Sequence, residues 1–326
     1  MMTLPDLTVL RPGSVAEAVE ALRANPGARV LAGGTDIVPN LKYGMYDTRH
    51  LVALRGLSSE LRYVREHQSG ELRLGAMCSI DELGRSELVK ERVPALADAC
   101  RQIAGPQLRR MGTLGGNLCL DTRCVYVNQS HFWRSALGYC LKKDGTVCHV
   151  VAGGKRCVAA ASNDTAPVLL ALDASVKTIS PRGERTIALH EFYVADGLHN
   201  TVLAPDELLT EVRIPAAAAR RRQAFAKLRM RAAIDFPALN LAVALELDGH
   251  SVKSVSLAVS ALAARPALIK GLQDLHGHAA DAIFAEELGR RAHKQCKPLT
   301  NIGIDPGWRR DVLPVLVRRT VLRAIG

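Results

Sequence analysis

The chain is poor in aromatic residues and has no long hydrophobic run. Phe, Trp and Tyr make up only 4% of its 326 residues. No apolar stretch approaches the roughly 20 residues that a helix needs to cross a bilayer. The start, Met1-Met2-Thr3-Leu4-Pro5, also lacks the basic and apolar regions of a secretory signal. We therefore expect a globular, cytoplasmic protein with reduced thiols and no membrane partner.

Acidic residues are in the minority. The chain has 32 Asp and Glu against 43 Lys and Arg, a net charge of +11. The basic residues are dispersed, with one run at Arg220-Arg221-Arg222, and no aromatic residues are interleaved to stack on bases. This pattern argues against a nucleic-acid partner. It suits an anionic cofactor, a phosphate-bearing substrate or an acidic electron carrier, and equally a solvated basic face without a specific partner.

The nicotinamide-type Rossmann fingerprint is absent, because no glycine loop here has the G-x-G-x-x-G spacing. Two other glycine loops are present. Ala32-Gly33-Gly34-Thr35-Asp36 follows a predicted strand over 28–31 and precedes a predicted helix over 37–42. Gly112-Thr113-Leu114-Gly115-Gly116-Asn117 follows a helix that ends near Ile103. Such loops let the backbone approach phosphate, so the pair predicts a dinucleotide site.

The length exceeds one ordinary core and predicts several domains in an α+β fold. Residues 1–60 predict a small βαβ unit whose helix opens with a capping box, Ser14-Val15-Ala16-Glu17. Residues 61–215 predict a mixed α/β unit, with a second capping box at Ser79-Ile80-Asp81-Glu82. Pro215 and the alanines that follow it mark the boundary of a C-terminal unit, 216–326. The elements predicted there are strands over 241–247 and 252–259 and helices over 279–291 and 312–325.

Four of the eight cysteines, Cys124, Cys140, Cys148 and Cys157, fall in one short segment. Reduced thiolates held together favour a soft metal. The long gaps between them suit a [4Fe–4S] cluster, because structural zinc sites usually use two short C-x2-4-C pairs. A four-thiolate zinc site and simple burial of small residues stay open as alternatives. So does a Rieske-like ligand set that includes His131 and His149.

Four segments resemble a known family: Leu31–Asp36, Gly112–Asn117, Asp164–Pro167 and Glu207–Pro215. Over nearly its whole length the chain is similar to the FAD-binding subunits of the molybdenum hydroxylase family. The resemblance implies a FAD-binding fold, built from a βαβ subdomain and a mixed α/β subdomain, and a C-terminal α+β domain. It implies no catalytic residue here, because the substrate binds at molybdenum on another chain. The FAD-binding residues that it implies are Arg29, Leu31, Ala32, Gly33, Gly34, Thr35, Asp36, Ile37, Ile103, Thr113, Leu114, Gly115, Gly116, Asn117, Asp164, Leu209 and Lys227.

The cysteine-rich segment is an insertion relative to ordinary members of that family. In those members a Ser-Asp pair follows the second loop within about ten residues, whereas about forty separate Asn117 from Asn163-Asp164. The insertion, at about 119–160, carries the four cysteine ligands, and it includes Cys119, which we expect to be a core or flavin-proximal thiol. An excess of basic residues accompanies the proposed anionic cluster: Arg123, Arg134, Lys142, Lys143, Lys155 and Arg156.

The insertion resembles that of a reductive branch of the family, whose flavoprotein subunit holds FAD and a [4Fe–4S] cluster. This implies that ferredoxin supplies electrons through the cluster and FAD to a [2Fe–2S] subunit and a molybdenum-cofactor subunit, in a heterohexamer-like complex. One alternative is a FAD subunit that passes electrons outward, as in xanthine or CO dehydrogenases. The other is a zinc-stabilised nucleotide-binding module without a redox role.

Overall fold

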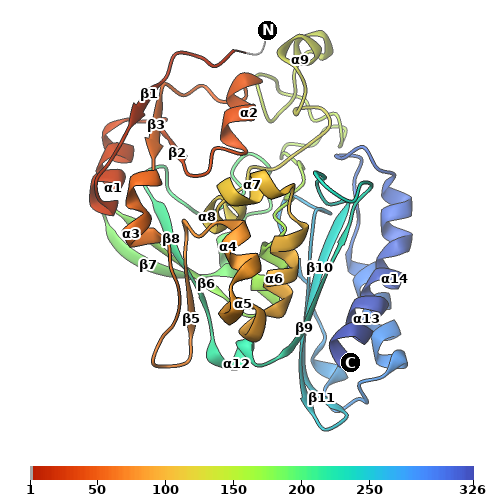
Figure 1. Cartoon of the computed structure of the whole chain (residues 1–326). Coiled ribbons are helices and arrows are strands. Elements are labelled where there is room, and N and C mark those ends of the chain that lie inside the picture. Colours follow the sequence, from red (N-terminus) through yellow and green to blue (C-terminus); the bar gives the residue numbers. More distant parts are fainter. Residues whose placement is uncertain (1–2) are drawn as a thin grey trace.

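The computed structural model describes residues 3–326, whose strands form three β-sheets (Figure 1). Met1 and Met2 lie outside the described residues. They begin the N-terminal segment in which no secretory signal was expected. The N-terminal elements form one end of the molecule, and the C-terminal helices lie on the opposite side of the central elements. This arrangement confirms the α+β class. Within residues 3–326, no helix combines the length and apolarity that a membrane crossing requires.

The N-terminal unit is a small parallel sheet with its connecting helices. Its elements are β1 (Thr8–Leu10), α1 (Val15–Ala24), β2 (Arg29–Leu31), α2 (Ile37–Lys42), β3 (His50–Ala53), η1 (Arg55–Leu57) and α3 (Ser58–Leu61). The strand order is β1-β3-β2, as a βαβ unit requires. Ser14 caps α1 by accepting a hydrogen bond from Glu17 N, but the Glu17 carboxylate accepts from Gly13 N. The predicted capping box therefore forms only in part.

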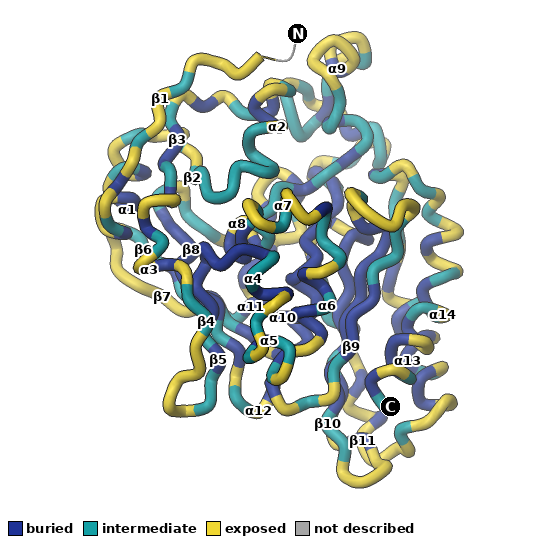
Figure 2. Tube along the Cα trace, in the orientation of Figure 1, coloured by how far each residue is buried: buried dark blue, intermediate teal, exposed yellow. Residues whose placement is uncertain are grey.

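The central unit is built on a five-stranded sheet. Its elements are β4 (Val64–Glu66), β5 (Leu72–Gly75), α4 (Ile80–Arg85), α5 (Glu87–Arg92), α6 (Pro94–Gln102), α7 (Pro106–Met111), α8 (Leu114–Leu118), α10 (Ala166–Ala171), β6 (Ser175–Ser180), β7 (Gly183–Ala188), α11 (Leu189–Phe192), β8 (Leu208–Ile214) and α12 (Ala216–Ala219). The antiparallel order is β4-β5-β8-β6-β7. Its strands share one buried core with α4, α6 and α10, dark blue in Figure 2. Ser79 and Glu82 form the complete capping box predicted for α4.

The C-terminal unit packs two helices on a four-stranded sheet. Its elements are β9 (Arg222–Leu228), β10 (Leu239–Asp248), β11 (Ser251–Ser260), β12 (Ala267–Leu268), η2 (Gln273–Leu275), α13 (Ala282–Gln295) and α14 (Pro306–Ile325). β10 and β11 form the predicted hairpin, with Gly249 in its turn at φ +57°. Helix α14 begins at Pro306 instead of the predicted Val312. Asp305 caps it, and a proline in the first turn loses no intrahelical hydrogen bond.

The insertion leaves and rejoins the central unit at one backbone bridge. Arg123 N donates to Ala160 O at 2.8 Å, and Ala160 N donates to Arg123 O at 2.7 Å. Between these residues the chain forms helix α9 (His131–Leu137), which lies beyond α2 at the edge of the molecule in Figure 1. Because the bridge joins the two ends of the insertion, it brings Cys124 and Cys157 close together.

Both outer units hold the insertion. Arg134 of α9 is only 1% exposed, and its Nη2 donates to Tyr43 O, just after α2, at 2.7 Å. On the other side, the Asn301 side chain donates to Val158 O at 2.6 Å, and its backbone carbonyl accepts from Val125 N at 2.9 Å. Since Val125 and Val158 each follow a cysteine of the predicted set, the loop before α14 helps to position those cysteines.

The Arg134 contact yields a stability prediction. Arg134→Met keeps the apolar stem but leaves the Tyr43 carbonyl without its charged donor, at a cost of about 1–3 kcal/mol. We expect the free energy of local opening of the insertion to fall by that amount in native-state amide hydrogen exchange. Arg23→Met is the control, because Arg23 forms an exposed ion pair with Glu20 on α1. Equal protection of the insertion in both variants would contradict this role for Arg134.

Candidate functional site

A cleft of about 620 Å³ is lined by residues of the N-terminal and central units and by Ile234, Asp235 and Phe236 of the C-terminal unit. That volume lies within the range of small-molecule sites. Both glycine loops reach its wall, although about eighty residues separate them in the sequence. The predicted FAD-binding residues that line the cleft are Arg29, Ala32, Gly33, Gly34, Thr35, Asp36, Ile37, Ile103, Thr113, Gly115, Gly116, Asn117, Asp164 and Leu209.

Three of the predicted residues are not part of the cleft wall. Leu31 belongs to β2, where its carbonyl accepts from Leu54 N at 2.9 Å. Leu114 is fully buried in the central core, and its N–H is already donated to Cys78 O. Lys227 lies behind the wall, where its ammonium pairs with the Asp164 carboxylate at 2.9 Å.

The two glycine loops pack directly against each other. An added Cβ on Gly33 would lie 1.8 Å from the backbone oxygen of Met111, so only glycine fits there. Gly34 adopts φ +75°, which an L-residue with a side chain rarely adopts. In the second loop, the Thr113 hydroxyl accepts from Gly116 N at 3.1 Å and caps α8. This contact makes a narrow backbone cradle at the base of the cleft, the form that a pyrophosphate-binding site takes.

A buried charge pair lies at the cleft wall. Asp164 faces the cleft, and its Oδ1 accepts from Asn240 Nδ2 at 3.0 Å as well as from Lys227. Burial raises the pKa of the Asp164 carboxyl, while Lys227 opposes that effect. The Asn117 side chain is fixed nearby, because its Oδ1 accepts from both the N–H and the hydroxyl of Thr165. The Asp164 carboxylate is thus a fixed polar group in an otherwise buried wall.

Several cleft residues carry no local sequence signal. Tyr46 lies on the wall beneath the guanidinium of Arg29, whose Cζ is 3.8 Å from the ring centroid. Asp36 pairs with Arg123 at 3.5 Å, and burial raises the pKa of its carboxyl to about 6. Some of the other lining residues adjoin predicted ones along the chain, namely Gly27, Ala28, Val30, Ala104, Gly112, Glu207 and Leu208, and Cys119 was predicted to be flavin-proximal. Long-range packing brings in the rest: Leu22, Leu54, Ala76, Met77, Ile80, Leu108, Leu120, Asp121, His199, Leu203, Ala204, Pro205, Ile234, Asp235 and Phe236.

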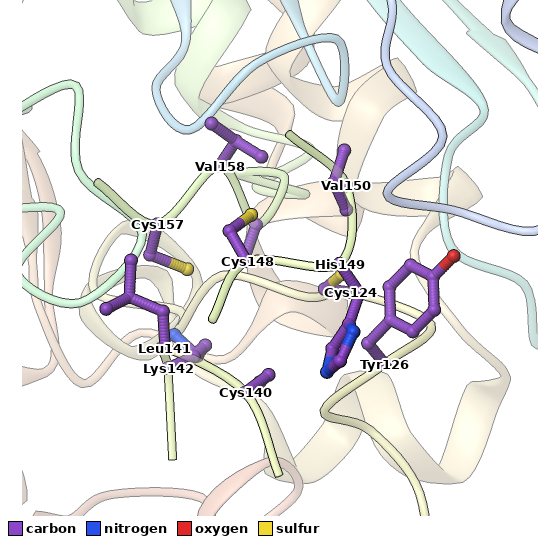
Figure 3. Close-up of a pocket in the computed structure, with 11 residues that line it drawn as sticks. Cys124, Tyr126, Cys140, Leu141, Lys142, Cys148, His149, Val150, Cys157 and Val158 are labelled. Atoms are coloured by element: carbon purple, nitrogen blue, oxygen red, sulfur yellow. The ribbon is translucent and has the colours of Figure 1, made fainter. Parts of the chain in front are cut away.

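The four predicted cysteine ligands surround one small cavity in the insertion (Figure 3). Cys124, Cys140, Cys148 and Cys157 are all buried, between 6% and 9% exposed. Burial raises the pKa of the Cys124 thiol to about 11, and the other three thiols add to the shift. Across residues 3–326, no group of three or more His, Cys, Asp or Glu side chains converges closely enough to hold a single metal ion. All four cysteines line the wall of the same cavity.

Three other candidate ligands lie in three different places: Cys119, His149 and His131. Cys119 lines the large cleft and not the cysteine cavity, a position compatible with the predicted flavin-proximal thiol. His149 lines the cavity, and its Nε2 contacts Tyr139 O at 2.6 Å. His131 lies on exposed α9. A Rieske-like set needs two histidines at the metal, and the cavity wall offers one.

Several of the basic residues predicted around the cluster are buried within the fold. Arg134 is buried against α2, and the Lys142 and Lys143 side chains are only 7% and 11% exposed, because each is ion-paired. The predicted excess of positive charge is present at the cavity, where Lys142 lines the wall, but these three side chains are not exposed to solvent. Lys155 and Arg156, just before Cys157, are exposed.

Comparisons with known proteins agree with this geometry. Residues 5–217 match the FAD-binding domain in molybdopterin dehydrogenase, and residues 223–324 match the CO dehydrogenase flavoprotein C-terminal domain. The aldehyde oxidoreductase FAD-binding subunit PaoB of Escherichia coli K12 is 31% identical, with 85% of this chain and 88% of the relative covered. The carbon monoxide dehydrogenase medium chain of Hydrogenophaga pseudoflava is 26% identical, with 95% and 94% covered.

Solved structures extend the likeness to the whole fold. A carbon monoxide dehydrogenase chain from Hydrogenophaga pseudoflava superposes with a TM-score of 0.82 at 25% identity, covering 99% of this chain and 98% of that one. A chain of the reconstituted enzyme from Oligotropha carboxidovorans gives 0.81 at 26% identity, with 99% of both chains covered. The chain belongs to the FAD-binding subunits of the molybdenum hydroxylase family. It is thus an oxidoreductase subunit with a FAD-binding domain.

The contact between the glycine loops predicts that a side chain at position 33 weakens FAD binding. Gly33→Ala must push the loops apart, at a cost of about 1–3 kcal/mol, so FAD affinity should fall about ten- to hundredfold. Flavin absorbance per chain after gel filtration measures this loss. Gly56→Ala is the control, because an added Cβ there meets Pro12 O at an ordinary 3.5 Å, outside the cleft. Full flavin retention by Gly33→Ala would mean that the cofactor lies elsewhere.

Asp36 predicts a pH dependence of FAD binding. Because the pKa of this carboxyl is raised to about 6, it is ionised above that pH and repels an anionic ligand. FAD binding should then take up a proton, and affinity should rise by up to about tenfold per unit as the pH falls from 7.5 towards 6. Asp36→Asn should flatten this dependence and strengthen binding at pH 7.5. An unchanged pH dependence of FAD affinity in Asp36→Asn would contradict this role for Asp36.

Proposed function

We propose that this chain is the FAD and [4Fe–4S] subunit of a molybdenum-dependent 4-hydroxybenzoyl-CoA reductase. The observation that carries the proposal is the enclosure of one cavity by four buried cysteines, within an insertion into the FAD-binding domain. A cysteine-rich insertion at this place and with this spacing resembles that of the β subunit of this reductase. The substrate assignment rests on that resemblance.

The spacing of the four cysteines favours a cluster over a zinc ion, because structural zinc sites usually use two short C-x2-4-C pairs. Tetrahedral zinc draws four sulfurs to about 2.3 Å from one point. A [4Fe–4S] cluster instead takes one thiolate at each of four corners, which leaves the sulfurs apart around a central space. Gly197 adds to the fit, since an added Cβ there would lie 2.6 Å from Cys157 Sγ. The wall beside this thiol has no room for a side chain.

The insertion brings the cysteine cavity next to the FAD cleft. Asp121 lines the cleft and Cys124 lines the cavity, and three residue steps separate their Cα atoms by at most about 11 Å. When bound, FAD and the cluster supply the redox chemistry of electron relay. The residues of this chain hold the two groups close together and shield them from water.

The partners follow from this role. A subunit that only relays electrons needs a molybdenum-cofactor subunit and a [2Fe–2S] subunit, in a heterohexamer-like complex, and a ferredoxin as the external donor. Lys155 and Arg156 are exposed beside Cys157, where they suit an acidic donor through electrostatic attraction.

A second candidate is a FAD subunit that delivers electrons outward. It is favoured by the relatives, whose names are those of an aldehyde oxidoreductase and carbon monoxide dehydrogenases. The assembled complex separates the two candidates. With reduced ferredoxin, the reductase should remove the phenolic hydroxyl of 4-hydroxybenzoyl-CoA, and Lys155→Glu with Arg156→Glu should slow the reaction most at low salt. No dehydroxylation by an intact complex would exclude the reductive assignment.

Cofactor content tests the cysteine set. Anaerobically purified chain should contain about four irons and matching acid-labile sulfide. Cys148→Ser should lose most of the iron while FAD stays bound, because the FAD cleft lies outside the cysteine cavity. Cys296→Ser is the matched control and should keep both groups, because Cys296 is buried in the C-terminal core and lines neither the cavity nor the cleft. Stoichiometric zinc without iron in the unaltered chain would overturn the cluster and support a structural zinc site.

A further inference from the structure

A buried charge pair spans the wall between the cysteine cavity and the FAD cleft. Lys142 lines the cavity, and Asp121 lines the cleft. Lys142 Nζ lies 2.7 Å from Asp121 Oδ1, and the lysine side chain is only 7% exposed. Within the described range 3–326, Lys142 is also the only lysine or arginine on the cavity wall. The positive end of the pair is thus on the cavity side, and the negative end is on the cleft side.

The lysine ammonium is held in one position. Besides Asp121, it donates to Thr122 Oγ1 at 2.6 Å and to Gly197 O at 2.5 Å, which uses all three of its N–H groups. The Thr122 hydroxyl donates to the same Gly197 carbonyl at 2.6 Å. Gly197 N in turn donates to Cys157 O at 2.8 Å. This network fixes the ammonium relative to a predicted cluster ligand.

The carboxylate is fixed from the other side. Asp121 Oδ2 accepts from the Tyr46 hydroxyl at 3.0 Å, and Tyr46 itself lines the cleft. Asn40 Nδ2 lies 3.3 Å from that hydroxyl and donates to Asp36 Oδ2 at 3.0 Å. The pair therefore belongs to a continuous polar network that runs from the cavity wall to the loop after β2.

We propose that the Lys142–Asp121 pair sets the difference between the reduction potentials of the cluster and the flavin. The proposal rests on the proposed function, since it requires a cluster in the cavity. A nearby positive charge stabilises the more negative, reduced state of a cluster and raises its potential. A nearby carboxylate disfavours the added electrons on the flavin and lowers its potential. The pair thus reduces the difference between the two reduction potentials, because it raises that of the cluster and lowers that of the flavin. An electron that passes from the cluster to the flavin therefore loses little free energy.

Two substitutions test the pair with opposite expected shifts. Lys142→Met removes the positive end, so both potentials should fall, and that of the cluster should fall more. Asp121→Asn keeps a hydrogen-bond acceptor for Lys142 but removes the negative end, so both potentials should rise, and that of the flavin should rise more. The difference between the two potentials should widen in both variants. Lys142→Arg retains the charge and should stay near the unaltered values.

The measurement is a potentiometric titration of the purified full-length chain with both cofactors bound. The reduced cluster is followed by electron paramagnetic resonance, and the flavin by visible absorbance. Lys143→Met is the matched control, because Lys143 is a neighbouring, ion-paired lysine that does not line the cavity. Lys143→Met should leave the difference between the cluster and flavin potentials unchanged.

The outcomes separate the two proposals. An unchanged difference between the two potentials in Lys142→Met and Asp121→Asn, or an equal change in Lys143→Met, would overturn the coupling role. If Lys142→Met fails to retain the cluster, Asp121→Asn decides alone, because it leaves Lys142 in place. Absence of an iron–sulfur signal in the unaltered chain would refute the proposed function, on which the coupling depends.

Discussion

The backbone bridge between Arg123 and Ala160 is the constraint on which the site depends. It closes a long insertion into a loop, so that a segment with one short helix can hold four cysteines around one cavity. The segment that enters that loop, residues 118–123, continues directly from the second glycine loop, whose Asn117 lines the FAD cleft. The same short stretch of chain therefore connects both cavities. Arg134 and Asn301 then fix the loop from opposite sides.

Charge in this region is organised internally. Most of the basic residues of the insertion are used within the fold, where they pair with Asp121, Asp144 and Asp47 or with backbone carbonyls. Buried charges require such partners, because desolvation otherwise costs several kcal/mol per ion. As a result, the wall between the cleft and the cavity is polar and rigid. A rigid wall suits electron relay, since fixed charges hold the potentials of bound groups at constant values.

Local signals explain what could be predicted from the sequence. The glycine loops, the Ser79 cap and the β10–β11 hairpin depend on residues close together in the chain, and all were found. The start of α14 was missed, because Gly307 and the polar residues Arg309, Arg310 and Asp311 obscure the helical pattern in its first turns. Tyr46 and Phe236 reach the cleft through long-range packing, which leaves no periodic trace. The Lys142–Asp121 pair was missed for the same reason.

The central claim is that one chain holds FAD and a four-iron cluster side by side. Anomalous diffraction from anaerobically grown crystals tests it most directly, because data at the iron and zinc absorption edges distinguish the two metals. The account predicts an iron peak at the centre of the cavity formed by Cys124, Cys140, Cys148 and Cys157, with flavin density in the cleft that contains Gly33 and Gly116. A single zinc peak, or a cavity without metal beside a filled cleft, would contradict it.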